Sequence, residues 1–296
     1  TYEKRDDLFE LYITDMQKIV SIPRPLKVVV DAGNGITGKF APDLLRAFGC
    51  EVTELYCELD GNFPNHEANP EDEENLRDLI QTMKTGKYDM GIGFDGDGDR
   101  IGIIDEKGRH YAADLHLLLL SKDLLTRQPG AKIVFDVKAS QIVTTLIRKH
   151  GGEPIMAKTG HSFIEKAMHE NGALLAGEVS GHLFFAENYY GFDDAFLAAL
   201  KTLSILAHSN KPLSEHFSDL PKTHATPEIK VPCPDDRKFQ IVDALRDYFT
   251  EHYDCITIDG DSVKDGTVTL RDRDTTLQVR IPAAEAVAQI KARLEA

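Results

Sequence analysis

The chain has 296 residues, of which 42% are hydrophobic, and it carries a formal net charge of −15. This length suits two or three globular domains, and the negative charge argues against a nucleic-acid or anionic-membrane partner, although a local basic pocket is still compatible with an anionic substrate. No run approaches the ~20 apolar residues of a membrane span, and the four cysteines show no CxxC pairing, so we expect a cytoplasmic protein with reduced thiols.

The first part of the chain alternates strand and helix patterns, which is typical of an α/β domain. A helix with apolar positions at helical spacing is expected within residues 1–20. The elements expected after it are strand Leu26–Asp31, helix Phe40–Phe48, strand Glu51–Tyr56, helix Glu71–Thr85, and strands Tyr88–Phe94 and Ile101–Asp105. A Gly-rich loop precedes the helix Phe40–Phe48, and an irregular loop containing His66 precedes the helix Glu71–Thr85.

A second α/β unit follows and repeats the order of the elements, although its residues are not obviously repeated. Its expected elements are helix Leu115–Thr126, strand Ile133–Asp136, helix Gln141–His150, strand Pro154–Ala157, helix Phe163–Asn171, strand Leu174–Ala176 and helix Asp194–His208. The stretch Lys211–Pro221 is rich in Pro, Ser and charge and is interpreted as a linker.

The chain therefore divides into three predicted domains. We expect two consecutive α/β mixed-sheet domains, 1–109 and 110–221, followed by a small α+β C-terminal domain, 222–296. The elements expected in this last domain are strand Glu228–Val231, helix Arg237–Thr250, strands Cys255–Asp259, Thr267–Arg271 and Leu277–Ile281, and helix Ala283–Leu294. The carboxyl ends of strands in an open α/β sheet are the usual place for ligands.

One loop directly after a predicted strand end carries three alternating carboxylates, Asp95, Asp97 and Asp99, and then Arg100. Three anions so close together repel one another, and a divalent cation is the simplest compensation. With no Cys or His in the loop, Mg²⁺ is favoured over Zn²⁺. Because Mg²⁺ commonly binds through a few carboxylates plus a phosphate oxygen, the loop points to phosphoryl chemistry, with Arg100 placed to meet the phosphate.

Three other interpretations fit the residues of this loop less well. Gly91, Gly93 and Gly96 match the dinucleotide fingerprint, but the aspartates would repel a pyrophosphate. An EF-hand requires glycine where Arg100 stands, and helices where strands are expected. A solvated acidic turn needs one or two such residues rather than three in strict alternation.

Two further loops carry polar side chains suited to a sugar phosphate. Glu178, Ser180 and His182 place a carboxylate, a hydroxyl and an imidazole within five residues, and such groups bind vicinal hydroxyls or exchange protons; a polar turn is the plainer alternative. His161 and Lys138 also have two interpretations: each is either a cleft residue or an ordinary structural or solvated side chain.

Taken together, these segments resemble the α-D-phosphohexomutase family, in its phosphomannomutase/phosphoglucomutase branch. The resemblance covers most of residues 25–210 and rests on segments in the family's order: Asp31-Ala-Gly-Asn-Gly35, Asp60-Gly-Asn-Phe-Pro-Asn-His66, Gly93-Phe-Asp-Gly-Asp-Gly-Asp-Arg100, Lys158-Thr-Gly-His-Ser162 and Gly177-Glu-Val-Ser-Gly-His182.

The resemblance implies reversible transfer of phosphate between C1 and C6 of a hexose, through an enzyme phosphoserine and a bisphosphorylated intermediate. It implies Mg²⁺ on Asp95, Asp97 and Asp99, an activator of the glucose 1,6-bisphosphate type, and Arg100 beside the transferring phosphoryl group. Glu178 and Ser180 would bind sugar hydroxyls, while Lys138, His161 and His182 would contact phosphate or transfer protons.

Two departures from the family pattern qualify this expectation. No segment resembles the T-A-S-H-N-P-like loop with the catalytic serine, so we expect the chain to correspond to the family's second to fourth domains and to be inactive without the serine domain, its missing partner. The expected phosphate-binding loop is degenerate, with Arg271 as its nearest match. The alternative is a non-catalytic sugar-phosphate-binding or regulatory homologue, and a phosphoglucosamine mutase is disfavoured by Glu178-Val-Ser180.

Overall fold

The computed structural model describes residues 5, 7–221, 236–237, 239–241, 243–244, 247, 251, 255–257 and 270–272. Its first sheet has the strand order β2-β1-β3-β4-β5, in which β1, β2 and β3 run parallel while β4 and β5 continue antiparallel. The strands are β1 (Lys27–Asp31), β2 (Glu51–Leu55), β3 (Met90–Phe94), β4 (Ile101–Ile104) and β5 (His110–Tyr111).

The second sheet repeats this topology strand for strand. Its order is β10-β9-β8-β6-β7, with β6, β7 and β8 parallel and β9 and β10 antiparallel. The strands are β6 (Lys132–Asp136), β7 (Glu153–Ala157), β8 (Leu175–Gly177), β9 (Leu183–Phe185) and β10 (Phe192–Asp193). The expected pair of consecutive α/β units with mixed sheets is confirmed.

Helices cover both faces of each sheet because the strands are apolar on both sides. In β1, Val28 and Val30 pack toward one core while Val29 packs toward the other. In the first unit α3 (Arg77–Met83) covers one face, and α1 (Leu8–Ile19) and α2 (Ala41–Ala47) cover the other. In the second unit α6 (His161–Asn171) lies opposite α5 (Gln141–Lys149).

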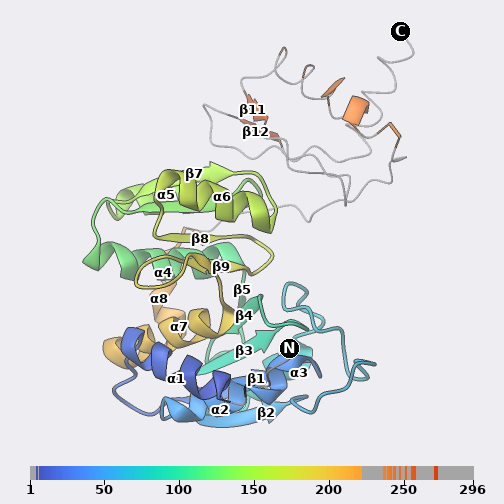
Figure 1. Ribbon diagram of the computed structural model, residues 1–296, viewed down its shortest axis with the longest axis vertical. Coiled ribbons are helices and arrows are strands. Elements are labelled where there is room, and N and C mark those ends of the chain that lie inside the picture. Colours follow the sequence, from blue (N-terminus) through green and yellow to red (C-terminus); the bar gives the residue numbers. More distant parts are fainter. Residues whose placement is uncertain are drawn as a thin grey trace.

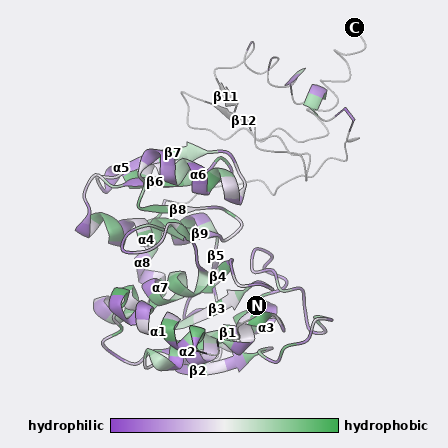
Figure 2. Cartoon of the chain, in the orientation of Figure 1, coloured by the Kyte–Doolittle hydropathy of each residue, from purple (hydrophilic) through white to green (hydrophobic). Residues whose placement is uncertain are grey.

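Two helices join the units into one continuous core. Helix α4 (Ala113–Arg127) contacts β8 and β4, while α7 (Ala195–Ser209) contacts β3 and β4, so both lie between the sheets (Figure 1). Figure 2 shows hydrophobic residues along these two helices, and their leucines belong to the largest hydrophobic cluster. Helix α7 therefore packs on the first sheet although it follows the strands of the second.

The remaining helices are short. A 3₁₀ turn, η1 (Ile36–Lys39), precedes α2, and α8 (Leu213–His216) follows α7. The helix expected over Glu71–Thr85 begins only at Arg77, because Asn69 and Asp72 accept backbone N–H bonds that hold the preceding residues in turns.

The interpretation of Lys211–Pro221 as a linker is wrong. Leu213 and Phe217 are buried in the main core, and Phe217 stacks on Tyr111 at 3.9 Å between ring centroids. Ser214 donates a hydrogen bond to Glu106, and Lys122 pairs with Asp219 at 2.8 Å. The segment is thus fixed onto the helices and strands before it.

In the C-terminal part, the described strands are β11 (Cys255–Thr257) and β12 (Leu270–Asp272), which pair antiparallel. These match parts of two predicted strands. The other predicted strands, Glu228–Val231 and Leu277–Ile281, and the helix Ala283–Leu294 lie outside the described residues, as does most of the predicted helix 237–250.

Replacing Leu213 by alanine tests whether α8 is part of the core. Leu213 is fully buried, whereas Leu59 is 62% exposed. We expect Leu213→Ala to lower the free energy of unfolding by about 2–5 kcal/mol because it leaves a cavity, and Leu59→Ala to change it by less than about 0.5 kcal/mol. Denaturant unfolding followed by circular dichroism measures both, and equal effects would refute the assignment.

Candidate functional site

The carboxylate loop follows β3 and returns to β4. Asp95 is fully buried, and its Oδ1 accepts hydrogen bonds from the backbone N–H groups of Gly98 (2.9 Å) and Arg100 (3.1 Å). Its Oδ2 accepts a bond from Arg100 Nε at 2.8 Å. These contacts wrap the loop around the Asp95 carboxylate and bring ligand oxygens of Asp95, Asp97 and Asp99 within 4.8 Å of one another.

The predicted residues therefore converge as a divalent-cation site requires. Asp97 is exposed, while Asp99 Oδ1 is buried without a hydrogen-bond partner. His182 Nε2 lies 3.4 Å from this oxygen and Arg100 Nε lies 3.8 Å from it. A buried carboxylate oxygen without a hydrogen bond is costly unless a cation lies near it, and each carboxylate oxygen retains lone pairs for a metal. By donor chemistry and by this orphaned oxygen, the loop fits Mg²⁺.

The loop after β1 packs directly against the carboxylate loop. Ile36 donates its backbone N–H to Gly96 O at 3.1 Å. A Cβ at Gly35 would lie 2.8 Å from that same oxygen, so only glycine permits this approach. This is a structural reason for the Asp31-Ala-Gly-Asn-Gly35 segment.

Glu178, Ser180 and His182 form the turn between β8 and β9. Glu178 is buried; its Oε1 accepts a hydrogen bond from Gly160 N–H at 2.6 Å, and its Oε2 lies 3.2 Å from His182 Nδ1. Ser180 Oγ lies 2.8 Å from the same nitrogen. Burial alone lowers the pKa of His182, but the hydrogen bond with Glu178 and the charges of Asp99 and Asp193 together raise it above its usual value.

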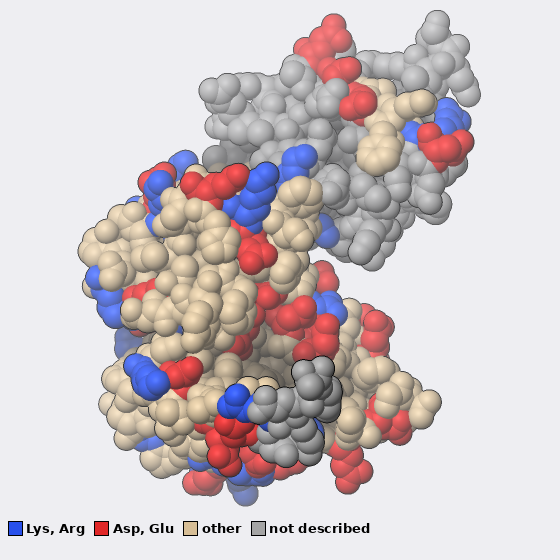
Figure 3. All heavy atoms as spheres, in the orientation of Figure 1, with Lys and Arg blue, Asp and Glu red and all other residues tan. Residues whose placement is uncertain are grey.

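The two turns meet directly. Arg100 and His182 form an antiparallel β-bridge, and Ile101 donates its backbone N–H to Gly181 O at 3.3 Å. His182 Nε2 lies 3.4 Å from Asp99 Oδ1. Figure 3 shows acidic side chains gathered beside the hollow where the two α/β units adjoin. The structure thus brings the predicted metal loop and the predicted sugar loop into one site.

His161 joins the same site from the first residue of α6, rather than from the expected turn before the helix. Its Nδ1 lies 2.9 Å from Asp193 Oδ2, and its ring lies edge-on to that of His182, 5.7 Å between centroids. Sequence reasoning missed Asp193. The one signal was its place just before Asp194, whose side chain caps α7 by accepting a hydrogen bond from Leu197 N–H at 2.9 Å.

Asp136, at the carboxyl end of β6, is a second residue that sequence reasoning missed. Burial, followed by the nearby charge of Glu178, raises its pKa to about 7, while Lys138 acts in the opposite direction. Its Oδ1 is buried without a hydrogen-bond partner. Lys138 is therefore close to the site and half-buried, as a residue contacting a bound anion would be.

His66 has a structural role in its loop. Its Nε2 lies 3.1 Å from Asp31 Oδ1, its Nδ1 lies 2.9 Å from Glu67 O, and its ring packs edge-on against Tyr56. The hydrogen bond with Asp31 raises its pKa. Arg271 falls in β12, and its side chain lies outside the described residues.

Comparison with known families identifies the chain. Residues 10–108 match the family model for phosphoglucomutase/phosphomannomutase alpha/beta/alpha domain II, and residues 113–224 match domain III of the same family. The chain belongs to the α-D-phosphohexomutase family. Residues 252–293 match the anticodon binding domain model.

Individual relatives agree with this membership. The chain is 46% identical over 255 residues to phosphomannomutase/phosphoglucomutase of Pseudomonas aeruginosa, covering 86% of this chain and 55% of that one. It is 43% identical over 286 residues to phosphoglucomutase of Neisseria gonorrhoeae, covering 94% and 62%. It therefore spans somewhat more than half the length of these relatives.

A solved structure shows the same fold. The crystal structure of a phosphoglucomutase/phosphomannomutase family protein from Burkholderia thailandensis superimposes with a TM-score of 0.82 at 35% identity, covering 99% of this chain and 64% of that one. In the described part of this phosphohexomutase chain, no helix is both long and apolar enough to cross a membrane.

The raised pKa of Asp136 predicts how stability changes with pH. Between pH of about 4 and 7 the unfolded chain releases this proton while the folded protein keeps it, so stability falls as pH rises. The slope contributed by this one group is at most about 1.4 kcal/mol per pH unit. We expect Asp136→Asn, which cannot ionise, to gain stability relative to the wild type over this range. Urea unfolding at several pH values measures the difference, and parallel curves would contradict it.

Proposed function

We propose that this chain forms the substrate- and metal-binding part of a phosphohexomutase of the phosphomannomutase/phosphoglucomutase type. The reaction is the reversible interconversion of hexose 1-phosphate and 6-phosphate, with a phosphoserine and a bisphosphorylated sugar as intermediates. The observation that supports the proposal is the backbone contact between the carboxylate turn and the Glu178 turn, because it joins the turn of the proposed cation ligands to the turn of the proposed hydroxyl-binding residues.

Asp95, Asp97 and Asp99 are the residues that would hold Mg²⁺. When bound, the ion would neutralise charge on a phosphoryl group, and phosphoryl transfer depends mainly on positioning and charge neutralisation. Arg100 contributes a fixed positive charge at the same place. Its Nε is bound by Asp95 and its Nη1 lies 3.3 Å from Asn69 Oδ1, so among the described residues its Nη2 is left to donate to a phosphate oxygen.

In this proposal Glu178 and Ser180 bind sugar hydroxyls. Glu178 Oε1 is bound by Gly160 N–H, which fixes the carboxylate, while Oε2 faces His182. A carboxylate held in this way accepts hydrogen bonds from hydroxyl groups. Because these hydroxyls lie away from the reacting phosphates, the sugar could bind in either orientation and present either its C1 or its C6 end to the phosphoserine.

Lys138, His161 and His182 supply positive charge or protons around the sugar. His182 bridges the two turns through Glu178 and Asp99, so its charge is held between them. His161 is more exposed and can reach a phosphate at the mouth of the site. In this proposal the phosphoserine belongs to a serine domain outside these 296 residues, which is the expected partner, and hexose phosphate and an activator of the glucose 1,6-bisphosphate type are the ligands.

Binding of mannose 1-phosphate tests the sugar site. We expect Glu178→Gln to weaken binding roughly 10- to 100-fold, because hydrogen bonds to a charged group contribute about 1.5–3 kcal/mol. Glutamine keeps the shape and the oxygen that accepts from Gly160. The matched control, Glu153→Gln, replaces an exposed residue of β7 and should bind like the wild type. Calorimetry measures all three proteins, and equal affinities would overturn the assignment.

Turnover tests the need for the serine domain. We expect the purified 296-residue chain, given Mg²⁺ and glucose 1,6-bisphosphate, to interconvert no glucose 1-phosphate above background, because no segment resembles the catalytic serine loop. The Pseudomonas aeruginosa relative is the positive control in a coupled assay. Measurable turnover that is lost in Asp97→Ala would refute this expectation.

The degenerate Arg271 loop favours a non-catalytic sugar-phosphate-binding protein as the second candidate. The sequence of the parent reading frame distinguishes this candidate from a mutase, because only the mutase requires a serine domain.

A further inference from the structure

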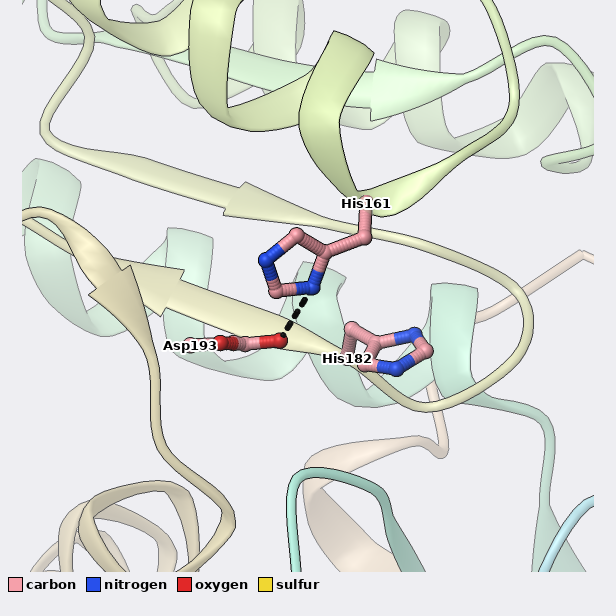
Figure 4. Close-up of side chains that lie close together, drawn as sticks. All are labelled: His161, His182 and Asp193. Atoms are coloured by element: carbon pink, nitrogen blue, oxygen red, sulfur yellow. Dashed lines mark ion pairs between the residues drawn. The ribbon is translucent and has the colours of Figure 1, made fainter.

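A second group of ligating side chains lies beside the carboxylate loop. His161 begins α6, His182 ends the turn before β9, and Asp193 closes β10. One ligand atom from each lies within 4.8 Å of the others. Figure 4 shows the His161 ring facing the Asp193 carboxylate, with the His182 ring beside them. All three residues come from the second α/β unit, so its sheet and helix fix their relative positions.

Asp193 carries an unsatisfied oxygen at the centre of this group. Its side chain is only 9% exposed, and its Oδ2 is buried with no hydrogen-bond partner, although His161 Nδ1 lies 2.9 Å away. The two groups therefore form an ion pair when His161 is protonated, although not a hydrogen bond. When His161 is neutral, this buried carboxylate oxygen has no hydrogen-bond partner, and a bound cation would recover the free energy that this costs.

His182 is held as metal-binding histidines usually are. Its Nδ1 faces Glu178 Oε2 at 3.2 Å and Ser180 Oγ at 2.8 Å, so a proton on Nδ1 is shared with these acceptors. The lone pair of a neutral ring then lies on Nε2. Metal-binding histidines typically donate their other ring N–H to a carboxylate in this manner, which fixes both the tautomer and the ring orientation.

We propose that His161, His182 and Asp193 form a binding site for a transition-metal ion of the Zn²⁺ class, which adjoins the carboxylate loop at Asp99 but shares no ligand residue with it. Two imidazole nitrogens with one carboxylate are a preferred Zn²⁺ ligand set, whereas Mg²⁺ prefers oxygen ligands alone. Ligand atoms on a tetrahedral Zn²⁺ lie roughly 3.4 Å apart, whereas the ligand atoms of these three residues lie within 4.8 Å of one another. Side-chain movements of about an ångström would therefore bring them to the distances that the ion requires.

The position of this site has a functional consequence that rests on the proposed function. The two histidines are the groups expected to contact a hexose phosphate, and an ion bound to them would occupy the same space. Zn²⁺ would therefore compete with hexose phosphate while Mg²⁺ would not. The inhibition would act at the sugar site rather than at the phosphoryl-transfer loop.

Metal titration of the purified chain, without substrate, tests the site. The chain is freed of metal with a chelator and titrated with Zn²⁺ by calorimetry in saturating Mg²⁺, and with Co²⁺ by visible absorption. We expect His161→Ala and Asp193→Asn each to weaken binding at this site at least tenfold, and the Co²⁺ spectrum to show nitrogen and oxygen ligation without thiolate bands. His161 is 44% exposed, so its replacement leaves the core intact, and Asp193→Asn preserves shape.

The matched control is Asp97→Ala, which removes a ligand from the carboxylate loop and leaves the histidine group unaltered. We expect its Zn²⁺ affinity to change less than threefold. Zn²⁺ binding lost in Asp97→Ala but kept in the other two variants would assign the ion to the carboxylate loop and overturn the proposal. Binding unchanged in all three, a thiolate spectrum, or no Zn²⁺ binding would also overturn it. Because hexose phosphate is absent, these results do not depend on the proposed mutase function.

Discussion

The whole site depends on one backbone contact between two turns. Gly181 O accepts the N–H of Ile101, and a Cβ at Gly181 would lie 3.1 Å from Ile101 O. Gly181 also has φ +106°, a conformation that side chains disfavour. Glycine thus fits both the limited space and the positive φ at this position. This contact fixes the carboxylate loop against the Glu178 turn, and without it neither the His182–Asp99 approach nor a shared ligand site would exist.

The two turns are equivalent positions in two copies of one topology. Each follows the third strand of its sheet and leads into the antiparallel fourth strand. Asp95 donates its N–H to Arg100 O at 3.3 Å, and Glu178 donates its N–H to His182 O at 3.0 Å. Each turn therefore begins with a buried carboxylate and ends with a cationic or titratable side chain. The same arrangement thus occurs twice, once with the three carboxylates of the first turn and once with the carboxylate, hydroxyl and imidazole of the second.

Features of the fold and of the site that depend on local sequence patterns could be predicted from the sequence. Apolar runs located the parallel strands, and the alternation of Asp95, Asp97 and Asp99 predicted a converging carboxylate cluster. Asp193 could not be found in this way, because β9 and β10 are too short to show a two-residue alternation and its proximity to His161 arises only from their pairing. Leu213, Phe217 and Leu220 do follow helical spacing and pack on the main core, but the pattern is only three residues long and lies among Pro, Ser and charged residues, so the sequence alone indicates a linker.

Carboxylates are concentrated where the two turns meet. Asp95, Glu178 and Asp136 are buried at adjoining strand ends, and burial raises the pKa of both Asp136 and Asp193. A phosphorylated sugar would add further negative charge to this region. Arg100, Lys138 and the two histidines offset only part of it, since Arg100 is already paired with Asp95. Among the described residues the carboxylates thus remain in excess, and a bound cation would offset part of their charge.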